Sequence, residues 1–173
     1  MSDDEPEEAR PGVHAASDWD EPLRIPEISG NVETVLVPVD GSPGSERGLA
    51  YADLVATMTG AEILVVVAFD PPHAIRRRGI LQTEHLQVTM ESDAKELAAE
   101  ATELLIGRGR RARAIAVRGD AAEAIIQTAE TEHVDLIVMG RRGLGRLHGL
   151  LMGSVSERVA RHATVPVLLA STE

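Results

Sequence analysis

The sequence is poor in residues that carry redox and stacking chemistry: it has no cysteine and a single tryptophan, tyrosine and phenylalanine. Without cysteine, disulfides, thiolate nucleophiles and thiolate metal sites are excluded. With 2% aromatic residues, the core must be built from Val, Ile, Leu and Ala, and single-strand nucleic-acid binders need stacking platforms that are missing here. The longest clear apolar run covers only residues 63–69, far short of a membrane span. We therefore expect a soluble protein that binds neither nucleic acid nor membranes.

Negative charge is concentrated at one end of the chain. Residues 1–30 hold nine acidic residues and two arginines, a net charge of −7, whereas the whole 173-residue chain carries −11. This segment has too few apolar residues to offset the entropy of ordering, so we predict a disordered acidic tail over residues 1–30 and one domain over residues 31–173. The alternative is that residues 19–28 dock as a short strap on the domain or on a partner. The tail also lacks the apolar segment of a secretory signal, which favours a cytoplasmic protein.

Apolar periodicity predicts strands that alternate with helices. Five apolar runs are typical of buried strands, and they cover residues 33–39, 63–69, 111–117, 134–139 and 165–170. Amphipathic patterns predict helices at residues 43–59, 83–106, from residue 120, and 155–162. Ser42 and Pro43 suit the start of the first helix and Gly60 its end. Arginines in the third strand and Pro166 in the fifth suit the margins of a sheet. This alternation indicates a parallel α/β sandwich.

A glycine-rich stretch, residues 140–154, lies between the fourth strand and the last helix and reads GRRGLGRLHGLLMGS. Glycines let backbone N–H groups approach a bound anion, and the arginines add cationic donors. The helix that follows would add the positive end of its dipole, so the stretch predicts a phosphate-binding loop. Two plainer interpretations stay open: a simple connection, or a capping box in which Ser154 and Glu157 start the helix without a ligand. A Walker A loop is excluded, because the only lysine, Lys95, lies elsewhere in the chain.

Four motifs, in the same order, resemble the universal stress protein family. Gly140-x-x-Gly143, nine residues and then Gly153-Ser154 look like the G-2x-G-9x-G-[S/T] loop of the family's ATP-binding branch. Residues 37–42 (VPVDGS) resemble the family's opening strand and turn, residues 119–125 the segment before its third helix, and residues 165–169 its last strand. The resemblance covers residues 34–170. It implies a single-domain, three-layer α/β sandwich of the adenine nucleotide alpha hydrolase-like type, with five parallel strands in the order 3-2-1-4-5.

In that order the first and fourth strands are neighbours, and the chain changes direction between them. Ligands of open α/β sheets bind at such a switch point, beyond the carboxyl ends of the strands. Asp40 follows the first strand and Gly140 ends the fourth, so the motifs and the implied topology point to one crevice. Asp40 has a plainer interpretation as well, since aspartate before glycine commonly forms a turn.

The resemblance also implies roles for individual residues. Asp40 would bind the ribose or the adenine edge, while Pro38 and Ala68 would flank the adenine. Met139 would pack near the ribose. The glycines of the loop, the Ser154 hydroxyl and the backbone at Val155 would hold the triphosphate, with Arg142 as a phosphate clamp. The expected ATP-binding residues are, in chain order, Pro38, Asp40, Ala68, Met139, Gly140, Arg142, Gly143, Gly153, Ser154 and Val155.

No catalytic or metal motif stands out. The six histidines contain no i, i+4 pair for zinc, and His148 is more simply a surface residue than an acid–base group. The arginines at positions 76–78 could face a nucleotide or simply be solvated. Asp40 and Asp120 could hold magnesium, but neither lies in a Walker B or kinase pattern. We expect no catalytic residue and no protein metal site. The expected cofactor is ATP with a Mg²⁺ ion held chiefly by the nucleotide.

Three functions fit these motifs. The first is a nucleotide-dependent regulatory module of the stress response, in which ATP orders the loop and changes the surface offered to a protein partner. The second is a slow ATPase or autophosphorylating protein that uses Ser42, Ser154 or Ser156. The third is a dimeric scaffold whose nucleotide site is vestigial or binds another adenine nucleotide, such as cyclic AMP.

The resemblance implies a homodimer formed through the last strand, by Val165, Val167 and Leu169. For the nucleotide site, we expect that Gly140→Ala combined with Gly143→Ala abolishes ATP binding without unfolding the domain.

Overall fold

Five parallel strands form one sheet in the order β3-β2-β1-β4-β5, which confirms the predicted topology. The computed structural model describes residues 30–70, 80–141 and 152–171. The predicted acidic tail therefore lies outside the described residues, apart from Gly30. The elements are β1 (Thr34–Pro38), α1 (Pro43–Thr59), β2 (Glu62–Phe69), α2 (Ile80–Gly107), β3 (Ala112–Arg118), α3 (Ala121–Thr131), β4 (Leu136–Gly140), α4 (Ser154–His162) and β5 (Val167–Ala170).

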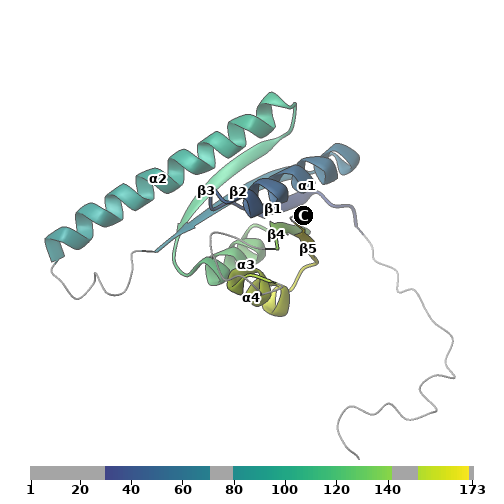
Figure 1. Ribbon diagram of the computed structural model, residues 1–173. Coiled ribbons are helices and arrows are strands. Elements are labelled where there is room, and N and C mark those ends of the chain that lie inside the picture. Colours follow the sequence, from purple (N-terminus) through teal and green to yellow (C-terminus); the bar gives the residue numbers. More distant parts are fainter. Residues whose placement is uncertain (1–29, 71–79, 142–151, 172–173) are drawn as a thin grey trace, which may run out of the picture. The chain divides into compact units, whose positions relative to one another are not determined.

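Helices cover both faces of the sheet, with α1 and α2 on one face and α3 and α4 on the other (Figure 1). Strand side chains alternate between these faces. In β1, Val35 and Val37 pack with α1 and α2, whereas Leu36 packs with α3 and α4. Both faces are buried, which explains why the strands are continuously apolar. As expected from the composition, the core is aliphatic, and Phe69 is the single aromatic residue among the buried described ones.

The ends of α1 follow the chemistry expected from the sequence. Ser42 is the N-cap, and its hydroxyl accepts a hydrogen bond from the Ser45 N–H (3.1 Å). Pro43 occupies the first helical position, where a missing N–H costs nothing. Gly60 ends the helix in the left-handed conformation, with φ of 76°, and its N–H donates to the Ala56 carbonyl. Local sequence therefore determines where this helix begins and ends.

Three elements begin two or more residues away from the predicted position. α2 begins at Ile80, three residues earlier than expected. β4 begins at Leu136 rather than at residue 134, because His133 adopts a positive φ of 51° and the Val134 N–H still bonds back to Ala129 of α3. β5 begins at Val167, one residue after Pro166, which has no N–H to give to a ladder.

Ion pairs fasten the amino ends of the strands. Arg113 of the edge strand β3 contacts Glu62 of β2 (3.0 Å) and Glu132 at the end of α3 (2.9 Å). The two carboxylates raise the pKa of Arg113, although burial acts in the opposite direction as the largest single influence. The Asp135 carboxylate accepts hydrogen bonds from the N–H groups of Glu33 and Thr34, which ties β4 to β1. The carboxyl ends of the strands lie at the opposite edge of the sheet.

Within the described part of the chain, none of the helices combines the length and the apolar character that crossing a membrane requires.

Candidate functional site

The carboxyl ends of β1 and β4 lie side by side at the centre of the sheet, where the chain changes direction. Pro38 ends β1, and the next residue, Val39, donates its N–H to Val66 of β2 (2.9 Å). Asp40 then leaves the sheet and is exposed. Ala68 lies near the end of β2, half-buried and opposite Val117. The structure thus brings three of the four residues expected around adenine and ribose to the same edge of the sheet.

The Asp40 carboxylate also builds the turn into α1. Its Oδ1 accepts hydrogen bonds from the Ser42 hydroxyl (2.6 Å) and from the Ser42 N–H (3.1 Å). Gly41 between them has a φ of 74°, a value that favours glycine. The turn-forming interpretation of Asp40 is therefore correct.

Gly140 is packed against the first turn of α1. A Cβ atom at Gly140 would overlap the carbonyl group of Gly44 and would lie 2.9 Å from its Cα. Gly48, one turn further along α1, faces the same point, because its Cβ would lie 3.1 Å from the Gly140 nitrogen. Gly140 does not have a positive φ. Close contact between a strand end and a helix, and not backbone freedom, therefore explains this glycine.

The N-terminus of α4 lies against the same strand end. The buried Ser156 hydroxyl donates to the Gly140 carbonyl (3.0 Å) and so anchors the first turn of the helix. The alternative interpretation of Ser154 and Glu157 as a capping box is wrong: Gly153 is the N-cap, Ser154 is the first helical residue, and the N-cap makes no side-chain hydrogen bond. The first N–H groups of a helix have no acceptor within it, so this end offers donors and positive potential at the switch point.

Gly153 contributes no donor of its own. Its N–H already donates to the Arg141 carbonyl (2.9 Å), and its φ of −75° is open to any residue. Ser154 is exposed, and Val155 is half-buried. Met139 is buried on the α3 and α4 face of the sheet. Arg142 and Gly143, the predicted clamp and the second loop glycine, lie outside the described residues, as does His148.

One residue of this region was not singled out by the sequence. Arg141 donates its N–H to the Ala170 carbonyl of β5 (2.8 Å) and accepts from Gly153, so its backbone joins β4, β5 and α4. Its Nε is buried and, in the part of the chain that the structure describes, is the only buried side-chain nitrogen or oxygen without a hydrogen-bond partner. The sequence offered little reason to select Arg141, since the loop contains three arginines that sequence alone does not distinguish.

Asp120, considered above as a magnesium ligand, has a structural role at the start of α3. It is the N-cap of α3 and accepts from the N–H groups of Ala122 and Glu123. Arg158 of α4 lies 2.9 Å from its Oδ1. The Glu123 N–H and then the Arg158 side chain lower the pKa of Asp120. Its carboxylate therefore links α3 to α4, which leaves it poorly placed to bind magnesium.

Because the pKa of Asp120 is lowered in the folded protein, its contribution to stability is present above the unfolded-state pKa and is lost as the pH falls through the folded-state value. Asp120→Asn keeps an oxygen for the cap and removes the charge. We expect it to lower the free energy of unfolding at pH 7 by up to about 1 kcal/mol, since the ion pair is exposed. Urea unfolding should show this difference vanishing near about pH 2. A difference independent of pH would mean that cap geometry, and not charge, is lost.

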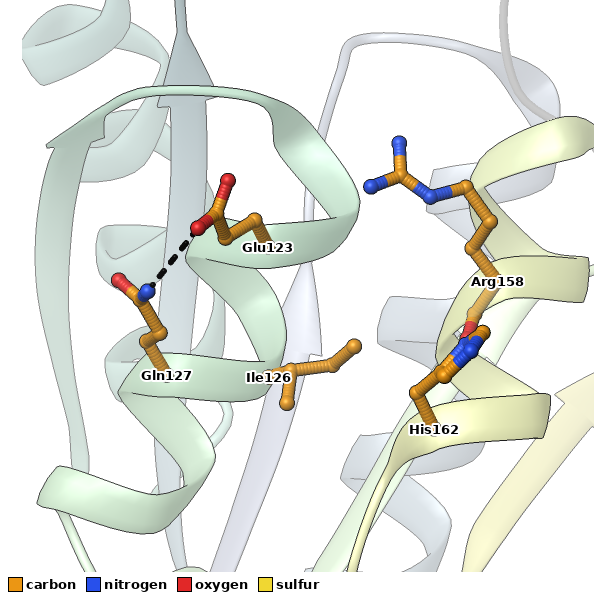
Figure 2. A pocket seen from close by; sticks show the side chains of 5 residues that line it. All are labelled: Glu123, Ile126, Gln127, Arg158 and His162. Carbon is orange, nitrogen blue, oxygen red and sulfur yellow. Dashed lines mark hydrogen bonds between the residues drawn. The ribbon is translucent and has the colours of Figure 1, made fainter.

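A separate groove of about 420 Å³ lies between α3 and α4. Figure 2 shows Glu123 and Gln127 on α3 opposite Arg158 and His162 on α4, with Ile126 between them. Its polar side chains already have partners: Gln127 bonds Glu123 (3.3 Å), Arg158 bonds Asp120, and the His162 ring bonds the Arg158 carbonyl (2.9 Å). None of the predicted site residues lines this groove. It is not the nucleotide site expected from the sequence.

Across the described ranges, no three His, Asp or Glu side chains converge on a point where they could hold a metal ion. A cation in the site would therefore need ligands from a bound molecule or from other parts of the chain.

Comparison with known proteins identifies the fold. The chain is 39% identical over 137 residues to a universal stress protein encoded in the 3′ region of a QAH/OAS sulfhydrylase gene in Thermus aquaticus, which covers 79% of this chain and 97% of that protein. It superimposes on the solved structure of the hypothetical protein MJ0577 of Methanocaldococcus jannaschii with a TM-score of 0.74 and 27% identity, covering 82% of this chain and 97% of that one. A universal stress protein solved in complex with cAMP matches with a TM-score of 0.62 and 26% identity, covering 83% and 100%.

The fold and the position of the switch point define an α/β protein with an open, all-parallel, Rossmann-like sheet. The sequence model of the universal stress protein family matches residues 31–171, nearly the whole of the described domain. The chain belongs to the universal stress protein family.

Proposed function

We propose that this universal stress protein is a cytoplasmic regulatory module of the stress response that binds ATP at the switch point between β1 and β4. Binding, and not turnover, is its activity. The nucleotide-bound form presents a different surface to a protein partner, so that ATP shifts the population toward one signalling state.

The observation that carries the proposal is the uncapped N-terminus of α4 at the carboxyl end of β4. Ser156 anchors this helix end to Gly140, and Gly153 supplies no capping side chain. Helix N-termini of this kind favour phosphate groups, because donors and dipole act together. β1, with Asp40 after its end, is the neighbouring strand, so base and ribose would extend toward it from the phosphates.

The residues present suit a nucleotide that brings its own Mg²⁺. Asp40 follows β1 at this edge and holds the turn into α1, and Asp120 is paired with Arg158. We propose that the metal is held chiefly by the phosphates and neutralises them. When bound, ATP would supply the anion for the α4 terminus, and the domain would supply orientation and shielding.

The alternative function, autophosphorylation, would use one of three serines named above, and their exposure differs. The hydroxyls of Ser42 and Ser156 are buried and hydrogen-bonded, whereas Ser154 is exposed. Of these three serines, Ser154 is the one that is accessible to phosphorylation. A related universal stress protein has been solved in complex with cAMP, so a cyclic nucleotide is the second candidate ligand for this protein.

We also propose a homodimer through the β5 edge. β5 is the last strand of the sheet in the described chain, and Val165, Val167 and Leu169 are only half-buried. A second β5, related by a two-fold axis, would cover them and pair the open edge. A monomeric mass in light scattering at micromolar concentration contradicts this assembly.

The experiment for the nucleotide proposal begins with the purified protein. It is denatured, and any released nucleotide is identified by ion-exchange chromatography. We expect ATP in near-stoichiometric amount, and it should stay intact during long incubation. ADP that accumulates with time supports slow turnover instead. If the protein is empty and also shows no heat with Mg-ATP in calorimetry, the proposal is wrong and the dimeric scaffold becomes the better hypothesis.

A further inference from the structure

Helix α1 has a second stripe of apolar residues besides the one that faces the core. The buried stripe consists of small residues: Gly44, Ser45, Gly48, Ala52 and Ala56. The second one, called here the outer stripe, consists of larger residues at the spacing i, i+3, i+4, i+7: Tyr51, Leu54, Val55 and Met58. Val55 is half-buried, but Tyr51 is 39% exposed, Leu54 51% and Met58 72%. Single exposed apolar residues are common, whereas a stripe at helical spacing indicates a second neighbour for the helix.

The outer stripe lies on the side of α1 that faces away from α2. Asp53 marks the opposite side, because its carboxylate contacts Arg110 (2.6 Å) and Arg108 (3.5 Å) in the turn between α2 and β3. With 3.6 residues per turn, Tyr51 and Met58 lie about 140–160° around the helix from Asp53. They therefore face the margin of the sheet that β5 forms.

Strand β5 continues the apolar surface below this stripe. α1 lies directly over β4, since a Cβ atom at Gly48 would lie 3.1 Å from the Gly140 nitrogen. Gly140 is paired with Ala170 of β5, and the chain of α1 runs back from there toward the amino ends of the strands. Tyr51, almost one turn after Gly48, thus reaches the level of Leu168. The Leu168 side chain is half-buried on the same face of the sheet.

The edge of β5 is too short to hold two copies of the chain together by itself. β5 has four residues, Val167–Ala170, whereas a stable interface buries about 800 Å² on each partner. Antiparallel pairing of two β5 strands about a two-fold axis would place both α1 helices on one face of the joined sheet. Their axes would be three strand spacings apart, about 14 Å. Helices in direct contact are about 8–10 Å apart, so only long side chains such as those of Tyr51 and Met58 close this gap.

We propose that the outer stripe of α1 is half of the homodimer contact and packs against the same stripe of a second copy. This inference rests on the proposed homodimer through the β5 edge. α1 begins at the Asp40 turn, and its first turn packs against Gly140. One helix therefore joins the subunit contact to the proposed nucleotide site.

The test measures the dissociation constant of the dimer by analytical ultracentrifugation for wild type, Tyr51→Glu, Met58→Glu and Leu104→Glu. For the two α1 variants we expect dissociation constants that are higher by about 30-fold or more, as for the central residues of other interfaces. Leu104→Glu is the matched control, because it adds the same charge at a residue of α2 that is 63% exposed. It should stay within about 3-fold of wild type. Circular dichroism checks folding, and Met58 is exposed enough that its replacement should leave the monomer intact.

A second measurement tests the contact directly, since the chain contains no cysteine. A short bis-maleimide should link Met58→Cys into covalent dimers and should leave Leu104→Cys monomeric. A wild-type dimer that tolerates both glutamate variants and gives no Met58→Cys product overturns the inference, leaves the stripe to a different protein partner, and keeps the β5 dimer. If wild type is monomeric, both fail. If Val167→Lys still dimerises while Tyr51→Glu does not, the outer stripe is the contact and the pairing of β5 is wrong.

Discussion

Gly140→Ala is expected to destabilise the domain by about 3 kcal/mol or more, at the upper end of overpacking costs. The added methyl group would overlap the backbone of Gly44, which cannot rotate away as a side chain can. Relief would require α1 to move off the sheet and would disturb the turn at Asp40 and Ser42. Urea unfolding monitored by circular dichroism gives the change in the free energy of unfolding.

The matched control is Gly107→Ala, where the new Cβ would meet nothing within 4 Å and no positive φ is required. We expect a change within about 0.5 kcal/mol. If Gly140→Ala is as stable as this control, α1 does not approach β4 as closely as described. The result also bears on the double variant Gly140→Ala with Gly143→Ala. The contact with Gly44 contradicts our expectation that this variant stays folded, so its loss of ATP binding would not identify the site.

Leu36→Ala is expected to lower the free energy of unfolding by about 2–5 kcal/mol, the usual range for a leucine removed from a core. Leu36 is fully buried in β1, the central strand, and packs with Leu64, Ile137 and the residues of α3 and α4. The cavity would lie between neighbouring strands that cannot collapse without breaking the ladder. Equilibrium urea unfolding measures this loss.

Leu104→Ala provides the control, because Leu104 of α2 is 63% exposed and alanine is the better helix former. We expect a change within about 0.5 kcal/mol. A loss below about 1 kcal/mol for Leu36→Ala would mean that the face under α3 and α4 is loosely packed. Both leucines lose the same atoms, so the comparison isolates burial.

Much of the fold could be predicted because its signals are local. Strand runs, the Ser42 cap and the Gly60 end depend on neighbours in sequence, and all three are confirmed. The edge positions of β3 and β5 followed from arginines and a proline that suit sheet margins. The strand order came from the family resemblance and is confirmed as well, although periodicity alone cannot specify which strands pair.

The site was harder to predict, because its residues serve packing and binding at once. Gly140 looked like a loop glycine, yet its environment is set by Gly44, which lies almost one hundred residues earlier. One interpretation of the sequence paired Ser154 with Glu157 in a capping box, but Gly153 is the N-cap of α4, and Ser156 donates to the Gly140 carbonyl of a strand distant in sequence.

The sequence by itself determined the class of fold and the ends of α1, which depend on periodicity and on hydrogen bonds between residues a few positions apart. The edge of the sheet at which a nucleotide is expected followed from the strand order that the family resemblance implied. The tertiary structure decided which glycine is required by contact, which carboxylate is already paired, and which arginine has a buried donor without an acceptor. The physical reason is that close contact, ion pairing and desolvation arise between segments distant in sequence, and they exist only once β4 lies between α1 and α4.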